Sequence, residues 1–272
     1  METCATRDLN ARMGQNIKDL LDEFPVMGDI LKSYGIGCVT CAVGTCALKD
    51  ILEYHALPDA QARTLMARLA AAMGLGLAPT EEPAGPEPAA PRAITYSAPM
   101  QCLVDEHALI KRWLAAIPAF ARGLDLESEA DRRRALGGVA FIRAYADRFH
   151  HAKEEDILFT RFAGGHEIIR VMLDDHATGR RHVQGMQDAV AARAREALAA
   201  HLLGYRDLLT EHIRKEDEIL YPWMDRQLTP AEVDDLAEAF RQADRRAAPG
   251  LADRFAQFIE GIEPSPAARH PA

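Results

Sequence analysis

Aromatic residues are scarce in this chain, and long apolar runs are absent from it. Phe, Trp and Tyr make up 6% of its 272 residues, whereas hydrophobic residues of all kinds make up 48%. Strand-forming runs of Val, Ile, Thr and Tyr are nearly missing, while the helix formers Ala, Leu, Arg and Glu are abundant. No stretch approaches the roughly 20 apolar residues that a membrane helix needs. The composition predicts an all-α protein that does not enter a membrane.

The chain also lacks an excess of positive charge. Its 32 Lys and Arg against 41 Asp and Glu give a formal net charge of -9, which argues against a nucleic-acid partner. Its first residues, METCATRDLNARMG, contain no apolar core of a secretory signal, so we expect a cytoplasmic protein. In that compartment the five cysteines are expected to stay mostly reduced and to bind metal or carry redox chemistry.

One segment rich in Pro, Ala and Glu, from Leu77 to Ala93, interrupts the helical pattern and is typical of a semi-rigid linker. The chain is expected to contain a small helical domain, a linker, an antiparallel up-and-down four-helix bundle and a helical tail, over residues 1–76, 77–97, 98–228 and 229–272. The bundle helices are predicted near Met100–Arg122, Ser128–Phe162, His166–Arg195 and Glu196–Gln227. Neither Gly nor Pro marks the boundary between the third and the fourth of these helices, between Arg195 and Glu196.

Two short segments of the predicted bundle repeat each other. His150, Lys153 and Glu154 are followed by Ile-Leu-Phe, and the segment starting at His212 has Lys and Glu at the same spacing before Ile-Leu-Tyr. Residues four apart share one face of a helix, so His150 with Glu154, and His212 with Glu216, can reach one metal centre. Imidazole and carboxylate suit iron, manganese or zinc, and carboxylates can bridge two cations. The repeat therefore predicts a dinuclear metal site.

Two further histidines lie at the same level of an antiparallel bundle. His107 is near the start of the first predicted helix, and His176 is about ten residues into the third. The path up one helix and down the next brings both to the height of the repeated segments. Metal sites in helical bundles are assembled in this way from facing helices.

With one His on each helix, and a Glu four residues after two of them, the segment from about residue 100 to 226 resembles the hemerythrin-like cation-binding family. The resemblance implies an oxo- or hydroxo-bridged pair of non-haem irons held by six residues: His107, His150, Glu154, His176, His212 and Glu216. Oxygen-carrying members have another His four residues after the third-helix His, where this chain has Arg180. With one imidazole fewer, the predicted site is similar to that of the family branch that repairs iron–sulfur clusters and handles nitric oxide. This resemblance implies an open coordination position for water, O2 or NO.

Several neighbouring side chains are candidates for supporting roles. His151 with Glu155 offers a competing i, i+4 pair, but the internal repeat favours His150 with Glu154. In an α-helix His151 would point about 100° away from His150 and would support the site from behind or lie at the surface. Glu155, Asp174 and Asp175 could orient an imidazole by accepting its outer N–H, and Tyr205 could line an access pocket or simply pack in the core.

The predicted small domain carries a separate cluster of sulfur atoms. Cys38, Cys41 and Cys46 lie in a loop between helices, and the Cys-x-x-Cys spacing allows a disulfide or a shared ion. The segment from Ile17 to about Ala72 resembles a short helical domain that is found with hybrid-cluster proteins and bears a proposed redox disulfide. A redox dithiol, an iron–sulfur or other metal site, and inert thiols all remain open.

Three functions fit these observations. The chain could bind or sense O2 or NO in a redox or nitrosative stress response. It could instead deliver iron to the damaged cluster of an iron–sulfur client, or reduce NO or peroxide with electrons from the cysteine domain or a redox partner. The sequence identifies no catalytic residue, so it does not decide whether the protein is an enzyme.

Overall fold

The computed structural model describes residues 11–36, 47–55, 57–75, 94–162 and 164–263. Cys38, Cys41 and Cys46 lie outside these ranges. The chain divides into two compact units, Met1–Thr95 with Glu218–Arg226, and Tyr96–Asp217 with Gln227–Ala272. None of the described helices is both long and apolar enough to cross a lipid bilayer.

The first unit is built from short helices around its own core. They are α2 (Ile17–Glu23), α3 (Val26–Ser33), α4 (Leu48–His55) and α5 (Asp59–Ala72). The break between α2 and α3 falls at Pro25, and the side chain of Asn16 caps α2 by accepting from the Lys18 backbone N–H at 2.8 Å. Apolar side chains from all of these helices form one buried cluster, which includes Leu20, Leu31, Leu48 and Leu65.

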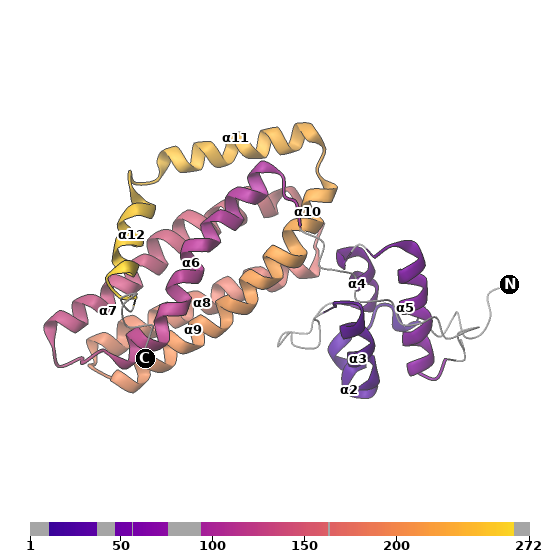
Figure 1. The fold of residues 1–272 in the computed structure, drawn as a ribbon, viewed down its shortest axis with the longest axis horizontal. Helices are drawn as coiled ribbons and strands as arrows, with labels where there is room; N and C mark the ends of the chain where they lie inside the picture. Colours follow the sequence, from indigo (N-terminus) through magenta and orange to yellow (C-terminus); the bar gives the residue numbers. More distant parts are fainter. Residues whose placement is uncertain (1–10, 37–46, 56, 76–93, 163, 264–272) are drawn as a thin grey trace, which may run out of the picture. The chain divides into compact units, whose positions relative to one another are not determined.

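The second unit contains a four-helix bundle, as the sequence predicts (Figure 1). Its four rods are α6 (Ala98–Arg122); α7 (Glu129–Phe141) with its continuation to Phe162; α8 (Glu167–Ala191); and α9 (Arg195–Lys215) with its continuation to Asp217. The α6 helix packs against α9, α9 against α8, and α8 against α7. The continuation of α7 over residues 142–151 packs against α6, so each rod lies beside two others. The interior is filled by large side chains such as Trp113, Phe141 and Tyr205, which are at most 1% exposed.

The second and fourth rods change their winding where the repeated segments lie. The chain is π-helical over η2 (Ile142–His151), η3 (Glu154–Leu158) and η5 (Glu216–Leu220), and it tightens to a 3-10 turn in η4 (Phe159–Phe162). After η5 the chain continues as an α-helix, α10 (Tyr221–Gln227). π-helical turns are rare, and they occur frequently at functional sites. Their presence at both repeats indicates that the backbone adjusts there to aim particular side chains.

Two tail helices, α11 (Pro230–Arg246) and α12 (Leu251–Glu260), pack on the bundle against α6 and the π-helical segments (Figure 1). Thr229 and Glu232 form a reciprocal capping box at the start of α11. On α12 the ring of Phe255 meets Phe141 edge to face at 5.1 Å, and Phe258 lies against Trp113 with ring centroids 5.9 Å apart. The tail therefore covers part of the bundle with aromatic contacts.

Candidate metal centre

Buried His and Glu side chains from all four rods meet inside the bundle in two adjacent groups. We call them the His107 cluster and the His151 cluster, after their first members. Their members are His107, His150 and Glu216 in the first, and His151, Glu154, His176 and His212 in the second. In each group the ligand atoms lie within 4.8 Å of one another. The structure thus brings together all six residues that the sequence analysis named, and it adds His151.

Pairs of imidazoles within each cluster point their Nε2 atoms at each other. The two Nε2 atoms are 2.8 Å apart in His107 and His150, and 3.0 Å apart in His176 and His212. Two nitrogen ligands about 2.1 Å from one metal ion stand about 3 Å apart when they subtend a right angle. The spacing therefore suits two ligands of one ion.

The two carboxylates connect the clusters. One oxygen of Glu216 is 3.3 Å from Nε2 of His107, and the other is 3.0 Å from Nε2 of His212. The Oε2 atom of Glu154 stands 3.4 Å from Nε2 of His176 and 3.7 Å from Nε2 of His150. Each carboxylate therefore faces an imidazole of both clusters, which is the arrangement that a bridging ligand needs.

The charge state of the inner groups shows that a cation fits between them. Burial acts to raise the pKa of Glu216, but the imidazoles of His212 and His107 outweigh it and hold that pKa well below its usual range. Both Glu216 oxygens are buried, and the imidazoles of His107 and His212 face them. An ionised carboxylate in such a place is stable only beside positive charge. Metal ions would supply that charge, and without them protons on the imidazoles do so.

The pKa values of the imidazoles differ because their surroundings differ. Burial lowers the pKa of His212, but Glu216 and Asp175 outweigh it and raise that pKa to about 9. The pKa of His107 is also raised, because Asp217 and Glu216 outweigh burial. In contrast, burial and the charge of His107 lower the pKa of His150 to about 4. Without metal, His212 therefore holds a proton near neutral pH, and His107 binds a proton more readily than His150 does.

A carboxylate orients the outer nitrogen of each of four imidazoles, and a cation in turn holds each carboxylate. The Nδ1 atom of His107 lies 2.7 Å from Asp217, which accepts from Lys111 at 2.6 Å. The Nδ1 atom of His150 lies 3.0 Å from Glu106, which accepts from Lys153. Such outer hydrogen bonds fix the ring and direct its other nitrogen inward.

The other two rods repeat the same arrangement. The Nδ1 atom of His176 lies 2.7 Å from Glu155, which accepts from Arg180 at 2.7 Å. The Nδ1 atom of His212 lies 3.3 Å from Asp175, which accepts from Lys215 at 2.7 Å. The segments Glu106–Lys111 and Asp175–Arg180 correspond, as do His150–Glu155 and His212–Asp217. The sequence repeat therefore extends over all four rods and includes the supporting charges.

Some of these supporting residues differ from the expectation. Glu155 and Asp175 hold imidazoles as the sequence analysis proposed, but Asp174 is exposed and pairs with Arg170 at 3.0 Å. Glu106 and Asp217 were missed. The signal for both is present, because each is the repeat partner of a residue that was named.

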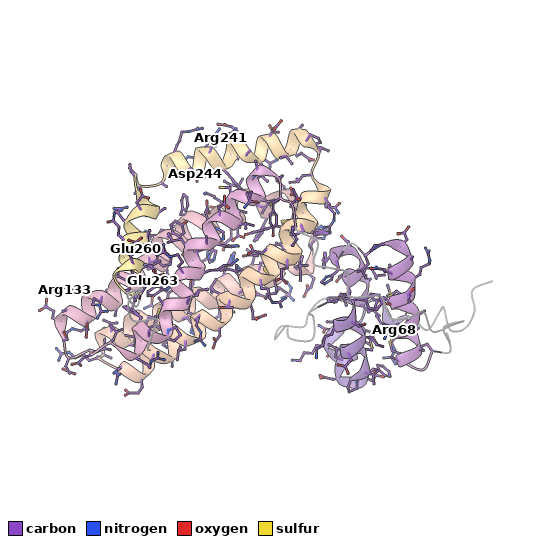
Figure 2. The ribbon with its side chains drawn as sticks, viewed as in Figure 1. Arg68, Arg133, Arg241, Asp244, Glu260 and Glu263 are labelled. Atoms are coloured by element: carbon purple, nitrogen blue, oxygen red, sulfur yellow. The ribbon has the colours of Figure 1, made fainter. Side chains whose placement is uncertain are left out.

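Lys153 links the metal centre to the tail. Its buried ammonium group contacts Glu106 and also lies 2.5 Å from Asp244. Figure 2 labels Asp244 on α11. It also stands 3.8 Å from the centroid of the Phe149 ring. Because Glu106 orients His150, the tail helix reaches a candidate ligand through a chain of charged contacts.

The position of His151 is the main difference from the expectation. Its ring stacks on that of His176, with centroids 3.9 Å apart and planes at 14°, and it belongs to the inner cluster rather than supporting it from behind. The reason is the π-helical winding of η2. Its turn is closed by residues five apart, so successive side chains are separated by less than the roughly 100° of an α-helix. Consecutive histidines can then both face inward.

Replacing His151 by glutamine is expected to reduce metal affinity at the His151 cluster at least about tenfold, because an inner imidazole is lost. The His107 cluster should keep its ion, so the metal content should fall without reaching zero. Metal analysis after dialysis against a graded chelator measures both effects. His166→Gln, at the start of α8 and outside both clusters, is the control. Unchanged metal content in His151→Gln would show that this residue is not a ligand.

Comparison with known proteins agrees with this geometry. Residues 98–224 match the family model of the hemerythrin HHE cation binding domain, somewhat less than half of the chain. Uncharacterized proteins of Mycobacterium bovis and of Mycobacterium tuberculosis are 24% identical to the chain over 153 residues, which is 53% of this chain. The chain spans 60% of the length of these curated relatives. No solved structure matches it.

The matched region holds all members of both clusters, from His107 in α6 to Glu216 in η5. These comparisons do not test the predicted resemblance of the small N-terminal domain to the domain found with hybrid-cluster proteins, so it stays a prediction. Over residues 98–224 the chain is therefore similar to the hemerythrin cation-binding domain, and the two buried clusters are the place in it where metal ions fit.

Proposed function

We propose that the bundle holds two non-haem iron ions, one in each cluster, and binds O2 or NO there as part of a cytoplasmic redox or nitrosative stress response. The observation that carries the proposal is the pair of buried clusters joined by Glu154 and Glu216. Imidazole and carboxylate ligands suit iron, and four of the imidazoles are already oriented from outside. When bound, ferrous iron supplies electrons and a coordination position for a diatomic ligand.

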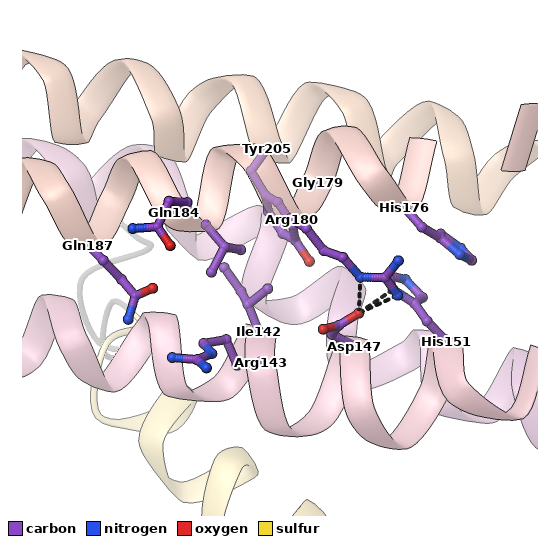
Figure 3. Close-up of a pocket in the computed structure, with 11 residues that line it drawn as sticks. Ile142, Arg143, Asp147, His151, His176, Gly179, Arg180, Gln184, Gln187 and Tyr205 are labelled. Carbon is purple, nitrogen blue, oxygen red and sulfur yellow. Dashed lines mark hydrogen bonds and ion pairs between the residues drawn. The ribbon is translucent and has the colours of Figure 1, made fainter. Parts of the chain in front are cut away.

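A cavity beside the clusters supports a small ligand. It has a volume of about 140 Å³, and its lining includes His151 and His176 at the inner end (Figure 3). A single water needs on the order of 10–15 Å³, so O2 or NO fits with room to move. Arg143, Arg180 and Gln184, which also line it, are exposed residues, so the cavity connects the His151 cluster with the surface.

Arg180 holds the wall of this cavity. Its guanidinium donates to Asp147 at 2.8 Å (Figure 3) and to Glu155 at 2.7 Å. Since Glu155 orients His176, the same contacts fix an imidazole of the His151 cluster. The side chain that replaces the additional histidine of oxygen-carrying relatives thus shapes the entrance and steadies the site.

The function is tested by purifying the chain without oxygen, counting its iron, and recording the visible spectrum before and after O2 or NO. Two irons per chain and a stable new absorption band with either gas would support binding or sensing. Steady consumption of NO or peroxide with a reductant would favour the reductase alternative. Restored activity of a damaged iron–sulfur client would favour the repair alternative. A folded chain without iron would refute the proposal.

Tyr205 provides a sharper test of the cavity. Its side chain is 1% exposed and lines the cavity, and its hydroxyl has no hydrogen-bond partner among the described residues. An unpaired buried hydroxyl costs about 1–3 kcal/mol, so Tyr205→Phe is expected to stabilise the ligand-free chain. The same change should shorten the lifetime of the gas adduct several-fold, because a donor to the bound ligand is lost.

Thermal unfolding and the decay of the adduct band measure the two effects. Tyr145→Phe, another buried tyrosine of the bundle that does not line the cavity, is the matched control. A purely structural Tyr205 would change stability and leave the adduct lifetime unaltered.

A further inference from the structure

Another pair of histidines faces each other away from both clusters. His182 of α8 and His201 of α9 have their Nδ1 atoms 3.3 Å apart, and their rings meet at 70° with centroids separated by 5.6 Å. Both side chains are partly exposed. The pair is therefore in reach of solvent, unlike the imidazoles of the buried centre.

The two helices are shaped around these rings by glycine. A Cβ atom on Gly204 would lie 2.5 Å from the His182 ring, and one on Gly185 would lie 2.3 Å from the His201 ring. Each histidine is followed three residues later by the glycine that receives the opposite ring, so the motif His-x-x-Gly occurs on both helices. Any larger residue would push a ring aside. The two glycines therefore leave the room in which the two imidazoles contact each other.

The pKa of His182 favours ligation. Burial, the neighbouring His201 and Arg181 lower the pKa of His182 below its ordinary value. His182 is therefore neutral at physiological pH, and a neutral imidazole is the form that binds a metal ion.

The separation of the two nitrogens also suits two ligands of one ion. Two nitrogens about 2.1 Å from one tetrahedral ion stand about 3.4 Å apart. The two Nδ1 atoms of His182 and His201 are 3.3 Å apart, which is close to that value.

We propose that His182 and His201 together bind one late first-row transition-metal ion, Cu²⁺ or Zn²⁺, at an exchangeable site between α8 and α9. Two imidazoles are the ligands, and water completes the coordination. Affinity of nitrogen sites is greatest for Cu²⁺ in the first-row series, which makes Cu²⁺ the most sensitive probe. This site is independent of the metal in the buried clusters.

The test uses the full chain with its buried centre filled and its iron counted before and after each addition. Titration with Cu²⁺ against a competing chelator is expected to show one tight Cu²⁺ per chain. Its electron paramagnetic resonance spectrum should carry hyperfine splitting from two nitrogens. His182→Gln or His201→Gln should each weaken binding at least about tenfold and remove the two-nitrogen pattern.

Gly204→Ala gives a second, independent test, because it keeps both imidazoles and displaces one ring. It too should weaken Cu²⁺ binding at least about tenfold, whereas His166→Gln should change nothing. Copper affinity that is equal in the wild type and the three variants, or a wild type that binds no Cu²⁺ beyond its buried centre, would overturn the proposal. If one histidine variant fails to fold, the other histidine variant and Gly204→Ala decide the outcome.

Discussion

Replacing Glu216 by glutamine is expected to remove most of the metal from the bundle and to destabilise the chain that remains. The two oxygens of Glu216 face imidazoles of different clusters, so one substitution disturbs both ions. Without metal, the substitution removes a carboxylate that raises the pKa of both His107 and His212, so these buried imidazoles lose the partner that stabilises their protonated forms. Breaking a buried ion pair in this way costs about 3–5 kcal/mol.

Metal content, chelator competition and denaturant unfolding measure these effects. Glu211→Gln is the matched control, because Glu211 is an exposed glutamate of the same helix that pairs with Arg214 at 3.0 Å. Glu216→Asp keeps the charge on a shorter side chain and should recover part of the stability with less of the metal. A Glu216→Gln chain with full metal content would contradict the bridging role.

Much of the bundle follows from helical periodicity and a few local signals. The first helix is predicted at Met100–Arg122 and observed at Ala98–Arg122, and it ends at Gly123. The turn between the third and fourth rods has no such signal in the sequence, since Arg193 takes the left-handed conformation that usually favours glycine, with φ of 54°. The helix there ends at Ala191 rather than at the predicted Arg195.

The residues of the site can be identified from the sequence, but the π-helical winding of the backbone that carries them cannot. The repeat of His, Lys and Glu identifies the faces that meet, because spacing by four residues is common to both segments. A π-helical turn leaves no comparable pattern, since it depends on how one rod packs against the others. The inward position of His151 therefore needed the structure.

The supporting charges could have been found from a longer repeat. Lys111 follows His107 by four residues and holds Asp217, just as Arg180 follows His176 by four residues and holds Glu155. Seen in this way, Arg180 is more than the absence of a histidine. It takes the place that Lys111 takes in the other half, while His151 adds an imidazole to the same cluster.

Metal affinity is expected to rise steeply with pH, because binding must displace protons from the buried centre. The pKa of His212 is raised to about 9, so this imidazole is protonated near neutral pH in the metal-free chain, and the pKa of His107 is also raised above its ordinary value. Ligation requires their neutral forms, so uptake releases a proton from each. Affinity should therefore fall by up to about hundredfold for each pH unit below these pKa values. As the pH rises through about 9, His212 loses its proton and the dependence becomes shallower.

Chelator competition with Zn²⁺ between pH 6 and 9, together with a pH indicator that reports proton release, measures this dependence. Asp175→Asn removes a carboxylate that raises the pKa of His212, so at pH 8 the affinity of this variant should depend less steeply on pH than that of the wild type. Asp174→Asn alters the adjacent exposed aspartate, which pairs with Arg170, and should behave as the wild type. Equal slopes in the two variants would mean that Asp175 does not set the protonation of His212. Affinity that stays constant over this range would mean that His107 and His212 are already neutral before the metal arrives. In that case the negative charge of Glu216 would have to be balanced by the metal alone, and the metal-free chain would carry an uncompensated carboxylate in its core.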